Sequence, residues 1–117
     1  MSYVNNEKDI NIDEATTHAI EITPKDSDDM PFELNGYDAI FTSIDGENKI
    51  EKRCTIEDNK IFLVLQPTET LFPEDYKKNT YNRNYQIRIF KEDVVYQVAS
   101  GKLIIHRVHK NYTSNPM

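Results

Sequence analysis

The chain has 117 residues and a formal net charge of −6, and its length suits one domain. Its single cysteine, Cys54, excludes an intrachain disulfide, and no apolar run approaches the roughly 20 residues that a transmembrane helix requires. The negative charge disfavours general binding to nucleic-acid phosphates. Tyrosine is the commonest aromatic, with 7 residues beside 5 Phe and no Trp. Aromatic and β-branched residues are prominent among the hydrophobic residues, and both types favour strands.

Charge is distributed unevenly along the chain. Residues 1–48 carry 12 acidic side chains against two lysines, a balance of −10, whereas residues 49–117 carry 12 basic against 8 acidic side chains, a balance of +4. Such asymmetry can give a fold an acidic and a basic side that orient a partner. The alternative is that the charged side chains are scattered at random over the surface and form no acidic or basic side.

The N-terminal third alternates between short apolar segments and turn-forming residues. Residues 1–8 are polar and predict a flexible arm. Ile10 and Ile12 alternate with polar residues, as in a short strand, and residues 17–23 show the same period of two. Residues 24–31 consist of strand breakers and turn formers and predict a loop, after which residues 32–34 form a short apolar return.

The remainder of the chain predicts longer strands. Pro67 with Glu69 indicates one helical turn, and residues 74–84 are polar and predict an exposed connection. Gly101 indicates a bulge or bend in the last strand. The expected strands cover residues 37–44, 50–56, 61–65, 85–90 and 94–106.

Seven or eight short strands separated by turns predict an all-β fold. We expect an antiparallel β-sandwich of the immunoglobulin-like or jelly-roll type over residues 9–106, with polar arms at residues 1–8 and 107–117. A small closed barrel is the main alternative. No stretch of ten or more residues has the apolar spacing of an amphipathic helix.

No pattern of catalytic or metal-binding residues stands out. His106 and His109 are three apart, a spacing that on a strand places them on opposite faces, and no further half-site accompanies them. Residues 26–29 are acidic but lack the glycine and distal glutamate of a calcium loop. Cys54 lies in a predicted strand and fits a small core residue better than a nucleophile. We therefore expect a protein that is not an enzyme, without a metal or cofactor.

Five segments resemble the β-sandwich domain of phage structural proteins, in particular the N-terminal domain of baseplate upper proteins from phages of Gram-positive hosts. They read Ile-Glu-Ile-Thr-Pro-Lys-Asp-Ser, Pro-Phe-Glu-Leu-Asn-Gly-Tyr, Ile-Phe-Leu-Val-Leu-Gln-Pro-Thr-Glu-Thr, Tyr-Gln-Ile-Arg-Ile and Val-Ala-Ser-Gly-Lys-Leu-Ile-Ile, and they span residues 17–106. Baseplate upper proteins continue into a helical linker, which this sequence does not contain. A lone sandwich of this size is also similar to the small auxiliary proteins that decorate phage capsids.

The resemblance implies a virion structural protein that is assembled in the host cytoplasm. We expect a capsid decoration protein that binds the major capsid protein in many copies or as a homo-oligomer, without nucleic-acid or membrane binding. A tail or baseplate component and a free carbohydrate-binding module are the alternatives. The partner-binding candidates are exposed or unassigned residues of the arms and the acidic loop: Tyr3, Val4, Asp28, Asp29, Arg107, Lys110 and Tyr112.

Overall fold

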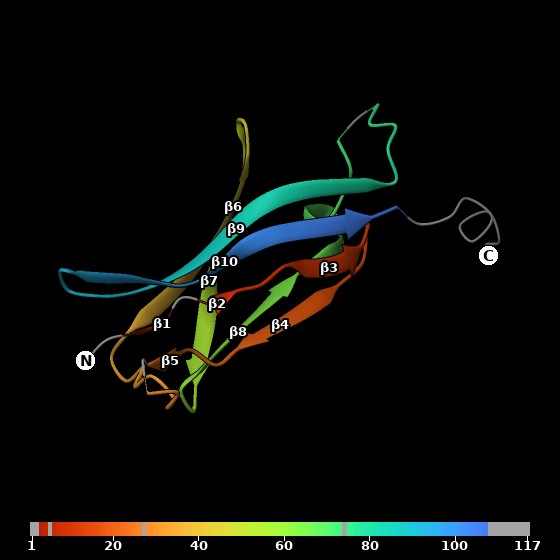
Figure 1. Ribbon diagram of the computed structural model, residues 1–117. Helices are drawn as coiled ribbons and strands as arrows, with labels where there is room; N and C mark the ends of the chain where they lie inside the picture. The colour runs from red at the N-terminus through yellow and green to blue at the C-terminus, as the bar shows by residue number, and fades with distance from the viewer. Residues whose placement is uncertain (1–2, 5, 27, 74, 108–117) are drawn as a thin grey trace.

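Strands make up most of the described part of the chain (Figure 1). The computed structural model describes residues 3–4, 6–26, 28–73 and 75–107, with the backbone alone at positions 3, 4 and 6. The strands of this part of the chain are β1 (Tyr3–Val4), β2 (Asn6–Glu7), β3 (Ile10–Asp13), β4 (His18–Ile22), β5 (Lys25–Asp26), β6 (Asp38–Asp45), β7 (Asn48–Glu57), β8 (Lys60–Leu65), β9 (Thr80–Lys91) and β10 (Val94–His106). The expected helical turn is a 3₁₀ helix, η1 (Pro67–Glu69). No helix within these residues is long and apolar enough to cross a membrane.

The main sheet has eight strands, in the order β2-β10-β9-β6-β7-β8-β4, with β3 also paired to β10. Both β2 and β3 run parallel to β10, whereas the other neighbours in this sheet are antiparallel. The expectation of a purely antiparallel sheet is therefore wrong. The reason is that the two N-terminal strands, β2 and β3, pair with the last strand, β10, which lies about ninety residues later in the sequence. No turn motif connects these strands, so the local sequence does not indicate that they pair.

The sheet curls until it is nearly closed, so that the architecture is barrel-like. Figure 1 shows β9 and β10 in one layer and β8 and β4 in the other, with β7 crossing between them. The first part of β7 pairs with β6 and its last three residues pair with β8, which continues the sheet around the curve. The all-β prediction is confirmed, and the layers belong to one continuous sheet.

One hydrophobic core fills the space inside the curl. Its fully buried members come from alternate positions of the strands, as the period of two predicts. Residues 32–34, expected as a short apolar return, have no strand conformation, and Phe32 and Leu34 are buried. The largest fully buried strand side chains are Phe41, Ile61, Leu65, Ile87, Ile89, Leu103 and Ile105.

Two predicted connections differ from the structure. Residues 74–84 were expected to be exposed, but β9 begins at Thr80, and Tyr81 and Arg83 are buried. Polar composition concealed this strand because an arginine and a tyrosine hydroxyl can be buried when hydrogen-bond partners are present. Residues 1–8 were expected to be a flexible arm, whereas β1 pairs with β5 and β2 pairs with β10.

Candidate functional site

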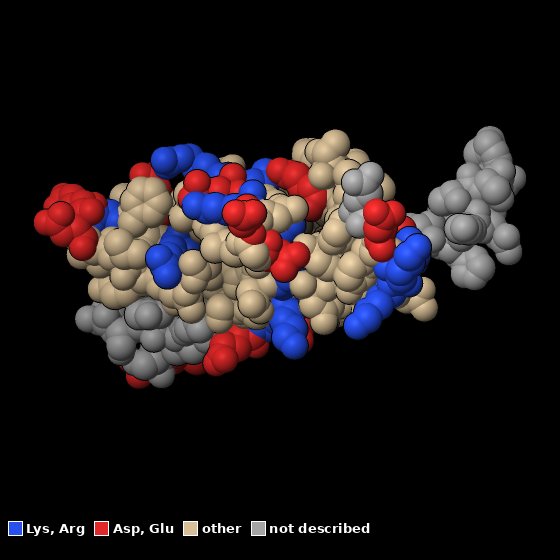
Figure 2. All heavy atoms as spheres, turned by 90° about the horizontal axis from the view of Figure 1, so that it is seen from above, with Lys and Arg blue, Asp and Glu red and all other residues tan. Residues whose placement is uncertain are grey.

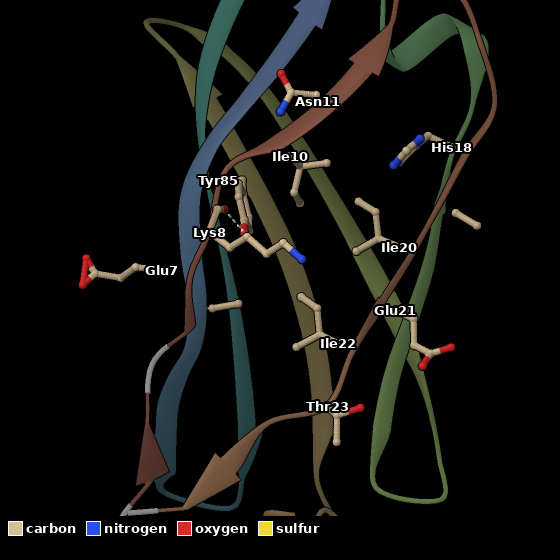
Figure 3. A pocket seen from close by; sticks show the side chains of 12 residues that line it. Glu7, Lys8, Ile10, Asn11, His18, Ile20, Glu21, Ile22, Thr23 and Tyr85 are labelled. Carbon is tan, nitrogen blue, oxygen red and sulfur yellow. Dashed lines mark hydrogen bonds between the residues drawn. The ribbon is translucent and has the colours of Figure 1, made fainter. Parts of the chain in front are cut away.

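An opening in the curled sheet separates its two ends. On one side lie β2 and β3, and on the other lies β4, and the pairing scheme of the described residues contains no ladder between them. We call this opening the seam, and it holds a cavity of about 620 Å³ (Figure 3). One wall carries Lys8, Ile10 and Asn11, the other carries His18, Ile20 and Ile22, and Tyr85 and Ala99 also line the cavity.

The N-terminal wall is one strand with a local interruption at Lys8 and Asp9. Its register against β10 is continuous, because Glu7 pairs with Ser100 and Ile10 pairs with Leu103. Between these pairs the Lys8 amide donates to the Ser100 carbonyl (2.9 Å), and the Lys102 amide donates to the Asp9 carboxylate (3.0 Å). A side-chain oxygen thus takes the position of a main-chain acceptor.

Tyr85 contacts the backbone at Lys8 from the inner side of the curled sheet. Its hydroxyl donates to the Lys8 carbonyl at 2.6 Å, and its side chain is buried (Figure 3). Burial raises the pKa of Tyr85, and the negative charge of Asp9 raises it further. The hydroxyl therefore stays protonated at neutral pH and can keep donating to the Lys8 carbonyl.

The Lys8 side chain brings a positive charge to the seam. Figure 3 shows it extending across the opening toward Ile20 and Ile22, while Glu7 and Glu21 point away. Glu21 forms an ion pair with Lys60 at 3.6 Å. Among the described residues, no carboxylate lies within ion-pair distance of the Lys8 amine. The seam thus combines isoleucine and polar side chains with a lysine amine that has no acidic partner among the described residues.

The predicted partner-binding residues fall at different places on the molecule. Tyr3 and Val4 lie in β1, where their backbones pair with Asp26 and Lys25. Asp28 and Asp29 lie in the loop that follows β5, and both are exposed.

That acidic loop is ordered by its own hydrogen bonds. The carboxylate of Asp26 accepts the amides of Asp28 (2.9 Å) and Met30 (3.1 Å), and Asp29 lies 3.8 Å from the Lys25 amine. The structure therefore brings the backbone of the predicted N-terminal residues close to the acidic loop.

Arg107 directly follows the C-terminal end of β10 and contacts other residues of this chain. Its guanidinium donates to the carbonyls of Lys78 (3.1 Å) and Tyr76 (2.5 Å) and lies 4.3 Å from the centre of the Phe72 ring. These contacts fasten the connection that precedes β9. Lys110 and Tyr112, the other predicted tail residues, lie outside the described residues.

Charges of both signs are interspersed over the face shown in Figure 2. On this face the uneven charge of the sequence does not separate into an acidic and a basic half.

Of the residues weighed for chemistry, Cys54 and His106 have contacts within the fold, and His109 lies outside the described residues. Cys54 lies half-buried in β7, and burial raises the pKa of its thiol to about 11, although Lys52 acts in the opposite direction. A His106 ring nitrogen hydrogen-bonds to the Asn11 side chain at 2.8 Å. No group of three His, Cys, Asp or Glu side chains in the described part of the chain could hold a metal ion.

A second, smaller hollow of about 300 Å³ lies near η1. Phe72 and Tyr81 line it beside the exposed Leu71, and Tyr76 packs edge-on against both rings. The Tyr81 hydroxyl hydrogen-bonds to Asp45, and burial, with the help of this bond, raises the pKa of Tyr81 to about 12.

Sequence reasoning missed the seam. Ile10, Ile20 and Ile22 were recognised as strand residues, but nothing local shows that the strands carrying them face each other unpaired. The one available signal was Lys8 followed by Asp9, two charged residues immediately before an alternating strand. Charged residues of this kind are common on edge strands, where they hinder pairing with another chain.

Comparisons with known proteins provide a fold likeness. No family model and no curated protein matches the sequence. The structure is similar to part of a putative glycoside hydrolase from Bacteroides vulgatus, with a TM-score of 0.54 and 8% sequence identity. The likeness covers 87% of this chain and 17% of the Bacteroides chain. It shows that the fold also occurs within a much longer protein.

Proposed function

We propose that this chain is a structural protein of bacteriophage particles that binds neighbouring virion proteins. The observation that carries the binding role is the seam, where two strand edges face each other across a cavity lined by both isoleucine and polar side chains. Strand edges with free backbone groups are common points of attachment for another chain. The phage context is supported by the resemblance of residues 17–106 to virion sandwich domains, and the fold is proposed to be a variant of that sandwich.

Capsid decoration is the specific role that we favour. A domain of this size offers limited contact area, and many copies on a symmetric lattice gain strength through avidity even when each contact is weak. The partner would then be the major capsid protein. In the alternative, the same domain occupies the tail or baseplate and binds proteins there.

Mass spectrometry of purified particles tests the proposal directly. We expect the chain to be present in particles that sediment as intact virions, in hundreds of copies for a capsid role. A few dozen copies or fewer would place it in the tail or baseplate. Its absence from washed particles, while the major capsid protein is detected, would contradict the virion proposal.

Carbohydrate binding is a second candidate, favoured by the hollow near η1. Phe72, which is partly exposed, lines this hollow together with the buried Tyr81 and the polar side chains of Asn48 and Thr68. The combination of aromatic and polar groups suits a sugar ring, and the Bacteroides protein whose fold is similar is described as a putative glycoside hydrolase. A glycan array probed with the tagged chain and with a Phe72→Ala variant tests this role. Binding that is lost in the variant would support it, and an array without signal would remove it.

A further inference from the structure

The pairing scheme leaves one edge each of β3 and β4 without a partner strand at the seam. Within the described residues, β4 is paired only with β8, and β3 is paired only with β10. Each strand therefore presents one edge of backbone N–H and C=O groups to the seam without a ladder partner. A segment in extended conformation could form a ladder with either edge, as in β-strand addition.

The opening is closed at both ends, which limits the length of an occupant. At one end β1 and β5, which belong to the same two segments that flank the seam, pair with each other. At the other end the turn between β3 and β4 is held by the amides of Ala15 and Thr16, which donate to the carbonyl (3.2 Å) and hydroxyl (3.1 Å) of Thr70. The free edges are therefore confined to a short stretch between β1–β5 and this turn.

The lining indicates the chemistry of the occupant. Ile20 is buried and Ile10 and Ile22 are partly buried, so inward-facing side chains of an occupant would meet an apolar patch of isoleucines, next to the polar side chains of Asn11 and His18. The Lys8 amine extends into the same space without an acidic partner among the described residues (Figure 3). Lys8 is exposed, and an acidic side chain on the inward face would form an ion pair with its amine.

We infer that the seam accepts one extended segment of a neighbouring protein, with apolar side chains at alternate inward positions and one Asp or Glu facing Lys8. This inference deepens the proposed virion role and rests on it for the source of the segment. A fatty acid could also present a carboxylate to Lys8 and a chain to the isoleucines. Its hydrocarbon chain has no donors or acceptors for the two backbone edges, and for this reason we favour a peptide.

NMR titration of the full chain with designed peptides tests the inference. The probe is a capped peptide of about five residues, the length of the free strand edges, in which valine alternates with threonine and the central residue is aspartate. Two matched peptides carry lysine at that position, or proline at alternate positions to remove backbone donors. Laurate is titrated in parallel.

We expect the aspartate peptide to protect the amides of β3 and β4 from exchange, with a Kd about fivefold lower than that of the lysine peptide. The proline peptide should not protect them. In a Lys8→Glu variant the preference for aspartate over lysine should reverse, whereas the exposed control Lys77→Glu should leave it unchanged.

Three results would overturn the inference: no protection of β3 and β4 at millimolar peptide, binding that ignores the charge at Lys8, or binding of laurate alone. Because the titration uses the isolated chain, its failure is distinct from absence of the chain in purified particles.

Discussion

Replacing Gly101 with alanine tests how tightly the N-terminal strand packs on β10. Gly101 has φ +153°, and a Cβ atom there would lie 2.3 Å from the carbonyl oxygen of Lys8 and 2.8 Å from its carbonyl carbon. Both distances are too short for a real contact, and both atoms belong to the backbone. The strand that carries Lys8 must therefore move away from β10.

The cost follows from the hydrogen bonds at this point. Displacement would break the bonds from the Lys8 amide to Ser100, from the Lys102 amide to Asp9, and from the Tyr85 hydroxyl to Lys8. At about 1 kcal/mol each, these amount to about 3 kcal/mol. Backbone strain at the positive φ adds about 1 kcal/mol more. We therefore expect Gly101→Ala to lower the free energy of unfolding by about 4 kcal/mol.

Urea denaturation with a matched control checks this magnitude. Gly46 also has a positive φ, +60°, but a Cβ atom there would meet nothing within 4 Å. Gly46→Ala should therefore cost only about 1 kcal/mol, from backbone strain alone. Amide exchange should also accelerate at Lys102 in Gly101→Ala and not in the control. Equal losses of stability in the two variants, with Lys102 still protected, would refute the close approach as the reason for this glycine.

Three further predictions concern the core and the buried polar groups. Phe41→Ala should lower the free energy of unfolding by about 3–5 kcal/mol in urea denaturation, because Phe41 is fully buried, and a loss below about 1 kcal/mol would contradict its central position. Arg83→Ala should cost about 3 kcal/mol, because the buried guanidinium donates to the hydroxyl and carbonyl of Ser43 and to the carbonyl of Asn48. A double-mutant cycle with Ser43→Ala should show a coupling of about 1 kcal/mol, and additive effects would argue against this contact. The Tyr81 pKa of about 12, against an ordinary value of 10.0, means that the folded state holds this proton more tightly, so its contribution to stability is complete below pH 10 and is lost as pH rises from 10 to 12. Urea titrations should show a smaller loss over this range in Tyr81→Phe, and identical profiles would contradict the raised pKa.

The strand positions could be predicted because alternation is a local property. Ile20 and Ile22 share a face whatever lies beside them, and β6 and β7, which a turn at Gly46 and Glu47 separates, cover the strands expected at residues 37–44 and 50–56. The short helical turn at Pro67 was also predicted correctly. Arg83 was not predicted to be buried, because its burial depends on Ser43 and Asn48, which lie 40 and 35 residues away.

The sequence by itself determined that the chain is all-β, where most strands lie and that one core is formed, because side-chain alternation and turn residues act over a few positions. The tertiary structure alone decided that β2 and β3 run parallel to β10, that the sheet curls into a nearly closed barrel, and that β3 and β4 face each other unpaired. Backbone hydrogen-bonding groups are the same in every residue except proline, so they carry almost no sequence signal for which strands pair. That choice depends on how the whole apolar surface is buried at once, and the seam and its lysine exist only as a result of it.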